Sequence, residues 1–247
     1  MLGRVGAATV LISMFVGPAG GVAAAQDESS SRPSFTPYAW VFGMKGRIGT
    51  GDSAFDVDLS PGELIDQVDV AFSLVLEAKR GRWFGRFDGT FLSASDREEV
   101  QGASDVVLEI DQGMGQPEIG YEVMVAPWGG IDLFAGARIW RLNAEVNTSG
   151  DGEDVEIASG DRTWADGVGG IRVRYNPAPK WRLFARGDAG AGGSNLSWQA
   201  LGGGGFDFSD CCGAVLAYRH LDVDYDHNGV INDTSMSGFT LGIEIRF

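Results

Sequence analysis

One short segment near the end of the chain has the residue types and spacing of a calcium site. Asp224, Asp226 and Asn228 occupy the first, third and fifth positions of a calcium-binding loop, and Gly229 follows where such a loop turns sharply. The last position of the motif holds Ser235 instead of a bidentate glutamate, and Asn-Gly is also the dipeptide of an ordinary hairpin turn. The spacing predicts a weak calcium site and leaves a plain hairpin turn as the alternative.

The chain contains two histidines, and each has a neighbour that could make it part of a catalytic pair. Asp226 directly precedes His227, and Ser197 would lie near His220 if the strands that carry them were neighbours. Pairs of this kind can activate a nucleophile for hydrolysis or acyl transfer. Neither pair is framed by a catalytic motif, so we expect no enzyme, no catalytic residue and no cofactor beyond weakly bound calcium.

Ten segments in which apolar and polar residues alternate must position these groups. A period of two predicts β-strands, and each segment is near the 9–11 residues that a tilted strand needs to cross a bilayer. The segments are Phe35–Ile48, Val70–Arg80, Trp83–Ser93, Gln112–Val125, Ile131–Asn143, Thr163–Tyr175, Trp181–Ala189, Asn195–Phe208, Gly213–Tyr225 and Phe239–Phe247.

The connections between these segments alternate between short turns and long links. The long links are Gly49–Asp69, Ser95–Asp111, Ala144–Arg162 and Asp226–Ser235, and two of them are crowded with acidic residues. Gly190–Ser194 is short where a long link is expected. A capping box, Ser60-Pro-Gly-Glu63, predicts one short helix in the first long link.

The charged residues of the segments are expected to face an enclosed lumen and the apolar residues to face outward. Ten acids occupy the alternating positions that are expected to face the lumen: Glu77, Asp88, Glu118, Glu122, Asp132, Asp166, Asp188, Asp222, Asp224 and Glu244. Ten bases also occupy such positions: Lys45, Arg47, Lys79, Arg86, Arg138, Arg172, Arg174, Arg182, Arg186 and Arg246. Such a set should form ion pairs, because an unpaired buried charge is costly. Arg219 falls on the outward parity, which predicts a β-bulge or a snorkelling side chain.

Aromatic residues gather at the segment ends that the short turns join, as in the belt at a membrane interface. They are Trp83, Tyr121, Trp128, Tyr175, Trp181, Phe206, Phe208 and Phe247. A soluble barrel or sandwich is the rival architecture, and it would place the Trp and Phe residues inside and the charged residues outside. The aromatic belt favours the membrane arrangement.

The final segment places Phe239, Leu241, Ile243, Ile245 and Phe247 on one face and ends on phenylalanine. This pattern resembles the terminal strand of small bacterial outer-membrane β-barrel proteins. The resemblance implies an all-β, transmembrane antiparallel up-and-down β-barrel of about ten strands, with eight as the alternative. It also implies the outer membrane of a Gram-negative cell, contact with outer-membrane lipid and lipopolysaccharide, recognition by the barrel assembly machinery, and a monomer. Lipid-modifying enzymes of this class pair Ser with His, and omptin-type proteases use Asp and His at the barrel rim.

The N-terminal residues predict export. One arginine, an apolar run too short to span a bilayer and a small-residue cleavage site predict a cleaved signal peptide over residues 1–25. Residues 26–34 form a polar linker, and residues 35–247 form the barrel. The net charge of −15 argues against a nucleic-acid partner. The adjacent Cys211 and Cys212 could form only a strained disulfide, so a turn with two free side chains is expected.

These observations predict an integral outer-membrane barrel with a non-enzymatic structural or surface-interaction role. A porin-like channel for small solutes is the first alternative, and an outer-membrane lipid-modifying enzyme is the second. The contents of the lumen separate the first two functions. A Ser–His contact at the outer rim would support the third.

Overall fold

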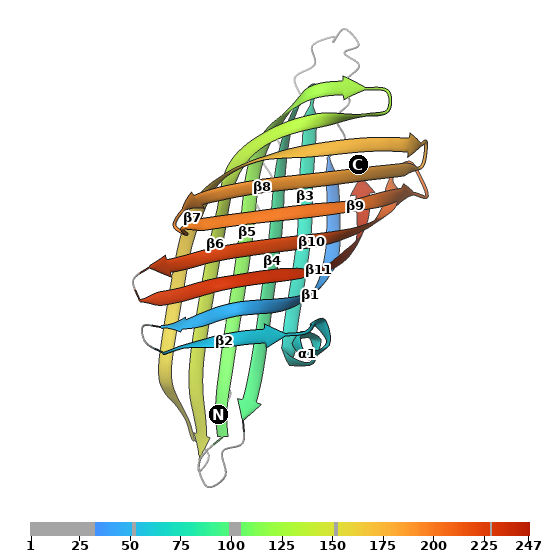
Figure 1. Ribbon diagram of the computed structural model, residues 1–247. Coiled ribbons are helices and arrows are strands. Elements are labelled where there is room, and N and C mark those ends of the chain that lie inside the picture. The colour runs from blue at the N-terminus through green and yellow to red at the C-terminus, as the bar shows by residue number, and fades with distance from the viewer. Residues whose placement is uncertain (1–32, 51–52, 99–104, 151–152, 228) are drawn as a thin grey trace, which may run out of the picture. The chain divides into compact units, whose positions relative to one another are not determined.

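The computed structural model describes residues 33–50, 53–98, 105–150, 153–227 and 229–247. The predicted signal peptide and all but the last two residues of the predicted linker lie outside these ranges. The elements in Figure 1 are β1 Ser34–Thr50, β2 Ser53–Leu59, α1 Pro61–Gln67, β3 Val68–Arg80, β4 Trp83–Glu98, β5 Asp105–Ala126, β6 Gly129–Gly150, β7 Glu153–Ala178, β8 Trp181–Gly192, β9 Leu196–Asp207, β10 Cys212–His227 and β11 Val230–Arg246.

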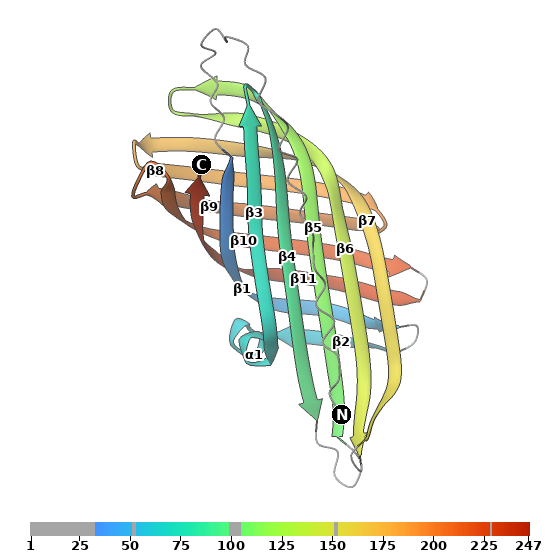
Figure 2. The same ribbon diagram turned by 180° about the vertical axis from the view of Figure 1, so that it is seen from behind.

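Ten of these strands close into an antiparallel barrel. β3 to β11 follow one another as neighbours, and β1 pairs with β11 to close the ring, while β2 pairs with β1 outside the ring. In Figures 1 and 2, β3 to β6 cross β8 to β11 steeply on opposite walls, as in a barrel of tilted strands. The predicted up-and-down barrel of ten strands is confirmed. Eight strands is wrong, because β8 and β9 pair continuously from Trp181–Phe206 to Gly190–Ser197.

The long links predicted from the sequence are mostly strand. β6 continues to Gly150 and β7 begins at Glu153, and the two pair out to their tips. β10 and β11 likewise pair out to His227 and Val230. The residues beyond the apolar segments therefore extend the hairpins, because the backbone hydrogen bonds of a strand ladder do not require an apolar face.

Side chains point as predicted on eight strands, β3 to β9 and β11. Phe72 and Leu241 are exposed on the outer face, whereas Gln116 and Asp132 on the inner face are fully buried. The exposed aromatic residues at the short turns also contact one another, with 4.9 Å between the ring centroids of Trp83 and Tyr121. The arrangement is apolar outside and charged inside, which is that of a barrel in lipid.

The prediction of which β10 side chains face the lumen is wrong. Arg219 and Leu221 are 2% and 1% exposed and point into the barrel, whereas Leu216 and Tyr218 are about half exposed on the outer face. Arg219 is therefore an ordinary inward residue, and the pairing of β10 shows no bulge beside it. The apolar residues near the loop end of β10 point inward because the lumen is aromatic there: the rings of Tyr225 and Trp164 stack 4.3 Å apart.

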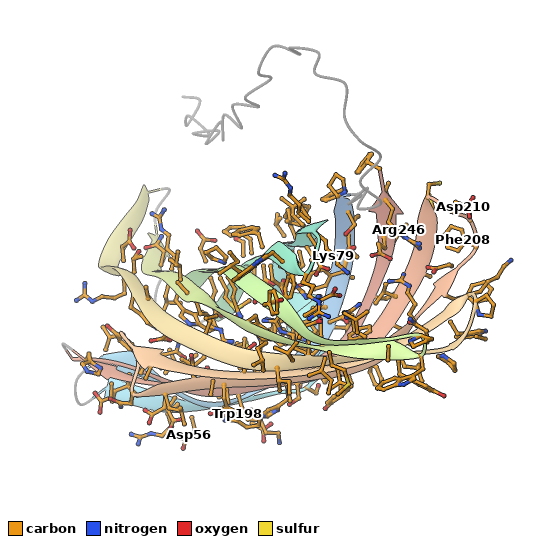
Figure 3. All side chains as sticks on the ribbon, turned by 90° about the horizontal axis from the view of Figure 1, so that it is seen from above. Asp56, Lys79, Trp198, Phe208, Asp210 and Arg246 are labelled. Atoms are coloured by element: carbon orange, nitrogen blue, oxygen red, sulfur yellow. The ribbon has the colours of Figure 1, made fainter. Side chains whose placement is uncertain are left out.

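The prediction of which β1 side chains face the lumen is also wrong, because the lumen near the loop end is apolar. Phe42 and Met44 are buried inside the barrel, and Val41 faces outward. Lys45 and Arg47 therefore leave the lumen and form exposed ion pairs with Asp58 and Asp56 of β2, at 2.9 Å and 3.8 Å. Figure 3 shows Asp56 on the outside of the wall. On β10, Asp222 and Asp224 also move to the outer face.

The predicted helix forms as α1 between β2 and β3. The backbone N–H of Ser60 donates to Glu63 at 2.8 Å and the backbone N–H of Glu63 donates to the Ser60 hydroxyl at 3.4 Å, which completes the capping box. The start of α1 lies against Gly43 of β1, where a Cβ atom would meet the Leu59 carbonyl oxygen at 2.8 Å. Among the described residues, no helix is long and apolar enough to span a membrane.

Cys211 ends the turn before β10 and Cys212 is the first residue of that strand, and both thiols are free. The two sulfur atoms are 2.9 Å apart, and a hydrogen bond with the Cys212 thiol lowers the pKa of Cys211.

Candidate functional site

A fully buried arginine lies at the centre of a polar layer that crosses the lumen. Arg138 of β6 donates to Gln116 of β5 at 3.1 Å and to Ser197 of β9 at 2.9 Å, and it forms an ion pair with Asp188 of β8. The side chains of Arg138 and Asp188 are both 0% exposed. Gln199 also donates to Asp188, at 2.7 Å. The layer therefore joins strands on opposite walls and fills the space between them.

A second ion pair extends this layer toward the short turns. Arg186 donates to both carboxylate oxygens of Glu118 at 2.6 Å, and to Asp188 at 3.0 Å. Arg86 donates to Asp88 at 3.1 Å. A bidentate arginine–carboxylate pair of this kind is among the stronger hydrogen-bonded arrangements in proteins.

Arginine–carboxylate clusters continue down to the short-turn end of the lumen. Arg172 donates to Glu77 at 2.6 Å and to Asp132 at 2.7 Å. Further ion pairs join Lys79 to Glu122, Arg174 to Glu122 and Asp132, Arg182 to Asp207 and Glu244, and Arg246 to Asp207 and Glu244. The predicted pairing inside the lumen is confirmed. Arg219 and Asp207 belong to the inward set and were missed by the sequence prediction.

Toward the loop end the lumen changes from charged to apolar. Trp140 and Trp164 stack at 5.9 Å, and Trp40 and Phe42 lie 4.4 Å apart. Phe42, Trp140 and Trp164 belong to a buried cluster, and Trp40 packs against it. The other members are Met44, Leu64, Leu92, Met114, Leu221, Val223, Tyr225, Val230 and Met236. The indole nitrogens of Trp40, Trp140 and Trp164 are buried without a hydrogen-bond partner. The lumen therefore has an aromatic upper layer and a charged lower layer.

The possible pair of His220 and Ser197 does not form. Ser197 points into the lumen, where it donates to Asp166 at 3.0 Å, whereas His220 lies on the outer face. His220 instead contacts Ser237 of β11, with 2.6 Å between Nδ1 and the hydroxyl oxygen. The Asn-Gly dipeptide in the sequence could have identified this partner: a two-residue hairpin loop there predicts that His227 pairs with Val230, and this register places His220 opposite Ser237.

The His220–Ser237 pair lies where the outer face changes from polar to apolar. The Trp198 ring is 4.7 Å from the His220 ring, and Trp198 points outward in Figure 3. One step toward the short turns, Tyr218 and Phe239 form an exposed edge-to-face pair at 5.2 Å. His220 and Ser237 therefore lie at the border between the polar and the apolar part of the outer face.

The other possible pair, Asp226 and His227, is also separated. The two residues are consecutive on β10 and therefore point to opposite faces of the sheet. His227 is 5.6 Å from the Tyr225 ring, measured between ring centroids.

Two of the three predicted calcium ligands are described. Asp224 and Asp226 lie on the outer face of β10, and Asp224 accepts a hydrogen bond from the Asn195 side chain at 3.1 Å. Asn228 lies outside the described residues. No group of three or more His, Cys, Asp or Glu residues suited to a metal ion occurs in the part of the chain that the structure describes. Calcium binding stays a prediction.

No protein-family model and no curated protein matches the sequence. Among solved structures, the outer-membrane protease OmpT from Escherichia coli matches with a TM-score of 0.52 at 8% identity, over 89% of this chain and 98% of that chain. Ail, the attachment invasion locus protein of Yersinia pestis, matches with a TM-score of 0.42 at 12% identity, over 88% and 99%. The translocator domain of autotransporter NalP from Neisseria meningitidis matches with a TM-score of 0.40 at 11% identity, over 90% of both chains. The chain has the fold of a bacterial outer-membrane β-barrel.

Proposed function

We propose that this barrel is an integral protein of the Gram-negative outer membrane with a closed lumen and a non-enzymatic structural or surface-interaction role. The observation that carries the proposal is the buried layer around Arg138, which joins β5, β6, β8 and β9 across the lumen. A water-filled pore needs a continuous polar path. Here the paired side chains around Arg138 cross the lumen and packed aromatic rings fill its upper part, while a separate cavity of about 330 Å³ lies toward the short turns.

Planar-bilayer recording of the purified protein tests this function. We expect no steady conductance above the membrane leak, because ions would have to displace Arg138 from Asp188 and pass the stacked Trp140 and Trp164 rings. A matched porin serves as the positive control for insertion. A large, stable conductance would make the protein a solute channel.

A second candidate function, hydrolysis of lipid acyl esters, is favoured by the contact between His220 and Ser237. In this candidate, His220 acts as a general base and Ser237 as a nucleophile, an arrangement that recurs in acyl-transfer chemistry. Asp222 lies on the same face as His220, two residues along β10. The pair would meet lipid esters at the headgroup level without any opening into the lumen.

Release of fatty acid from vesicles of a phospholipid with a labelled acyl chain separates this candidate from the non-enzymatic role. Under the non-enzymatic role, the parent and Ser237→Ala release the same background amount. Release by the parent that falls at least a hundredfold in Ser237→Ala and in His220→Ala, but not in Ser235→Ala, would establish the esterase instead. Folding is monitored by the gel shift on heating.

Two further proposals concern ligands and partners. Asp224, Asp226 and Asn228 bind calcium weakly, with a dissociation constant of about 10⁻⁴–10⁻³ M, because the motif lacks its bidentate acid. Identical calorimetric titrations of the parent and Asp226→Ala would refute this site.

The barrel is monomeric, contacts lipid and lipopolysaccharide, and is inserted by the barrel assembly machinery.

A further inference from the structure

The cavity of about 330 Å³ in the lower lumen is a pocket with one open and one closed end. Arg174 and Arg182 line the open end, at the short turns, and their side chains are 31% and 35% exposed. Arg186 lines the closed end, where it is buried and donates to Asp188 in the layer around Arg138. Solutes can therefore enter from the short-turn end, which faces the periplasm in this class of barrel.

One wall of this pocket is apolar. Phe184, Leu201 and Val215 come from the inner faces of β8, β9 and β10, which are consecutive neighbours in the sheet. Ala217 follows Val215 on the inner face of β10 and pairs with Gly203 of β9. A Cβ atom at Gly203 would overlap the Cβ atom of Ala217, so this stretch of wall carries only small side chains. The space that larger side chains fill elsewhere in the lumen stays open here.

The charged residues around the pocket are unequal in sign. Among the described residues that line it, six are arginines and three are carboxylates: Arg86, Arg172, Arg174, Arg182, Arg186 and Arg219, and Glu77, Asp88 and Glu244. Carboxylates that pair with these arginines lie behind them. Asp132 pairs with Arg172 and Arg174, Asp188 pairs with Arg186, and both carboxylates are 0% exposed. The pocket therefore presents positive charge between walls of low dielectric constant, which concentrates anions.

The closed end also contains a cation that is only partly compensated. Arg219 is 2% exposed, and its guanidinium donates to the Tyr38 hydroxyl at 3.0 Å and to the Met114 sulfur at 3.8 Å. Its carboxylate partner, Asp88, is 3.8 Å away and already accepts hydrogen bonds from Tyr38 and Arg86. Among the described residues, the Nε atom of Arg219 has no hydrogen-bond partner. A buried charge without a close counter-ion is costly, so an anion in the pocket would be favoured.

We propose that the pocket binds a compact organic anion from the aqueous phase at the short-turn end. The apolar body of the ligand lies against Phe184, Leu201 and Val215, and its negative group points toward the arginines of the closed end. The cavity volume falls within the range of small-molecule sites, about 300–1,000 Å³, which combine apolar walls with a few convergent polar groups. The inference goes beyond the proposed structural role and requires no path through the barrel.

Calorimetric titration of the detergent-purified barrel with adamantane-1-carboxylate tests the pocket. We expect saturable binding at one site. Adamantane-1-carboxamide has nearly the same shape without the charge, and it should bind about tenfold more weakly or worse, because hydrogen bonds to a charged group are the stronger ones. Acetate has the charge without the apolar body, and it should also bind about tenfold more weakly or worse, because it buries little apolar surface.

Val215→Trp and Leu216→Trp are a matched pair of variants on β10. Val215 lines the pocket, whereas Leu216 is exposed on the outer face. Val215→Trp fills the pocket and should weaken binding of the carboxylate about tenfold or more, because the apolar body loses its space. Leu216→Trp should bind as the parent does. The gel shift on heating confirms that both variants are folded.

Arg219→Met tests the charge of the closed end. Asp88 keeps its hydrogen bonds from Tyr38 and Arg86 in this variant, so the barrel should fold. Binding of the carboxylate should weaken about tenfold or more, because a cation that faces the ligand is lost, and binding of the carboxamide should not change. Arg82→Gln, in an exposed turn at the same end of the barrel, is the matched control and should bind as the parent does.

Two sets of results would overturn the proposal. Failure of the parent to bind the carboxylate, or equal binding by Val215→Trp and Leu216→Trp, would show that the pocket is not the site. Equal binding of the carboxylate and the carboxamide, or equal binding of the carboxylate by Arg219→Met and Arg82→Gln, would show that the arginines do not select an anion. The titrations are carried out in detergent, so their results are independent of the conductance measurement.

Discussion

Arg138→Ala is expected to lower the free energy of unfolding by about 3–5 kcal/mol, the range for breaking a buried ion pair by removing one partner. The substitution removes the ion pair with Asp188 and the hydrogen bonds to Gln116 and Ser197. Asp188 keeps Arg186 and Gln199, but a charge with 0% exposure loses its closest counter-ion. Urea unfolding of the barrel in lipid vesicles, followed by tryptophan fluorescence, measures the change.

Arg141→Ala is the matched control on the same strand. Arg141 lies on the outer face of β6, nearer the loop end, and its ion pair with Asp161 has side chains that are 70% and 55% exposed. An exposed pair contributes no more than about 1 kcal/mol. Equal destabilisation by Arg138→Ala and Arg141→Ala would show that the layer around Arg138 does not hold the walls together.

Leu241→Arg is expected to destabilise the barrel in a bilayer by about 2–4 kcal/mol, the cost of arginine on the lipid face near the bilayer midplane. Leu241 is 59% exposed on the outer face of β11, between Phe239 and Ile243. In water, the same substitution at an exposed position would change stability by no more than about 0.5 kcal/mol. The loss of stability caused by Leu241→Arg therefore shows whether lipid or water surrounds the outer face. It is measured by reversible unfolding in vesicles.

Ser235→Arg provides the comparison on the same strand. Ser235 shares the outward face but lies nearer the loop end, beside Asp222. Arginine on the lipid face near the membrane interface lowers the free energy of unfolding by about 0–1 kcal/mol. If Leu241→Arg and Ser235→Arg are equally mild, the outer face is not in hydrocarbon and the proposed location is wrong.

Alternation was sufficient to predict the barrel and its inward charges on most strands, because one face of each was clearly apolar. It failed on β1 and β10, where apolar residues occupy the inner face near the loop end. Phe42 and Leu221 are buried there against other apolar groups of the upper lumen, and a rule that sends apolar residues to lipid assigns them to the wrong face.

The sites were predicted less completely than the strands. The pairing of His220 with Ser237 follows from the hairpin register, which the Asn-Gly turn made available. The position of β2 outside the ring depends on where β1 stops pairing with β3, and no residue pattern marks that point. The end of the β1–β3 pairing at Tyr38–Ser73 and the unpaired Nε atom of Arg219 could therefore be found only in three dimensions.

Spin labels along β10 test most directly whether the barrel has lipid outside and buried side chains inside. With Cys211 and Cys212 replaced by serine, single labels at Leu216, Ala217, Tyr218 and Leu221 are compared in vesicles by their accessibility to oxygen and to a water-soluble nickel chelate. The structure predicts high oxygen accessibility at 216 and 218, low oxygen accessibility at 217 and 221, and little contact with the chelate at any of the four positions. The opposite phase, or ready access of the chelate to 217 and 221, would contradict the account.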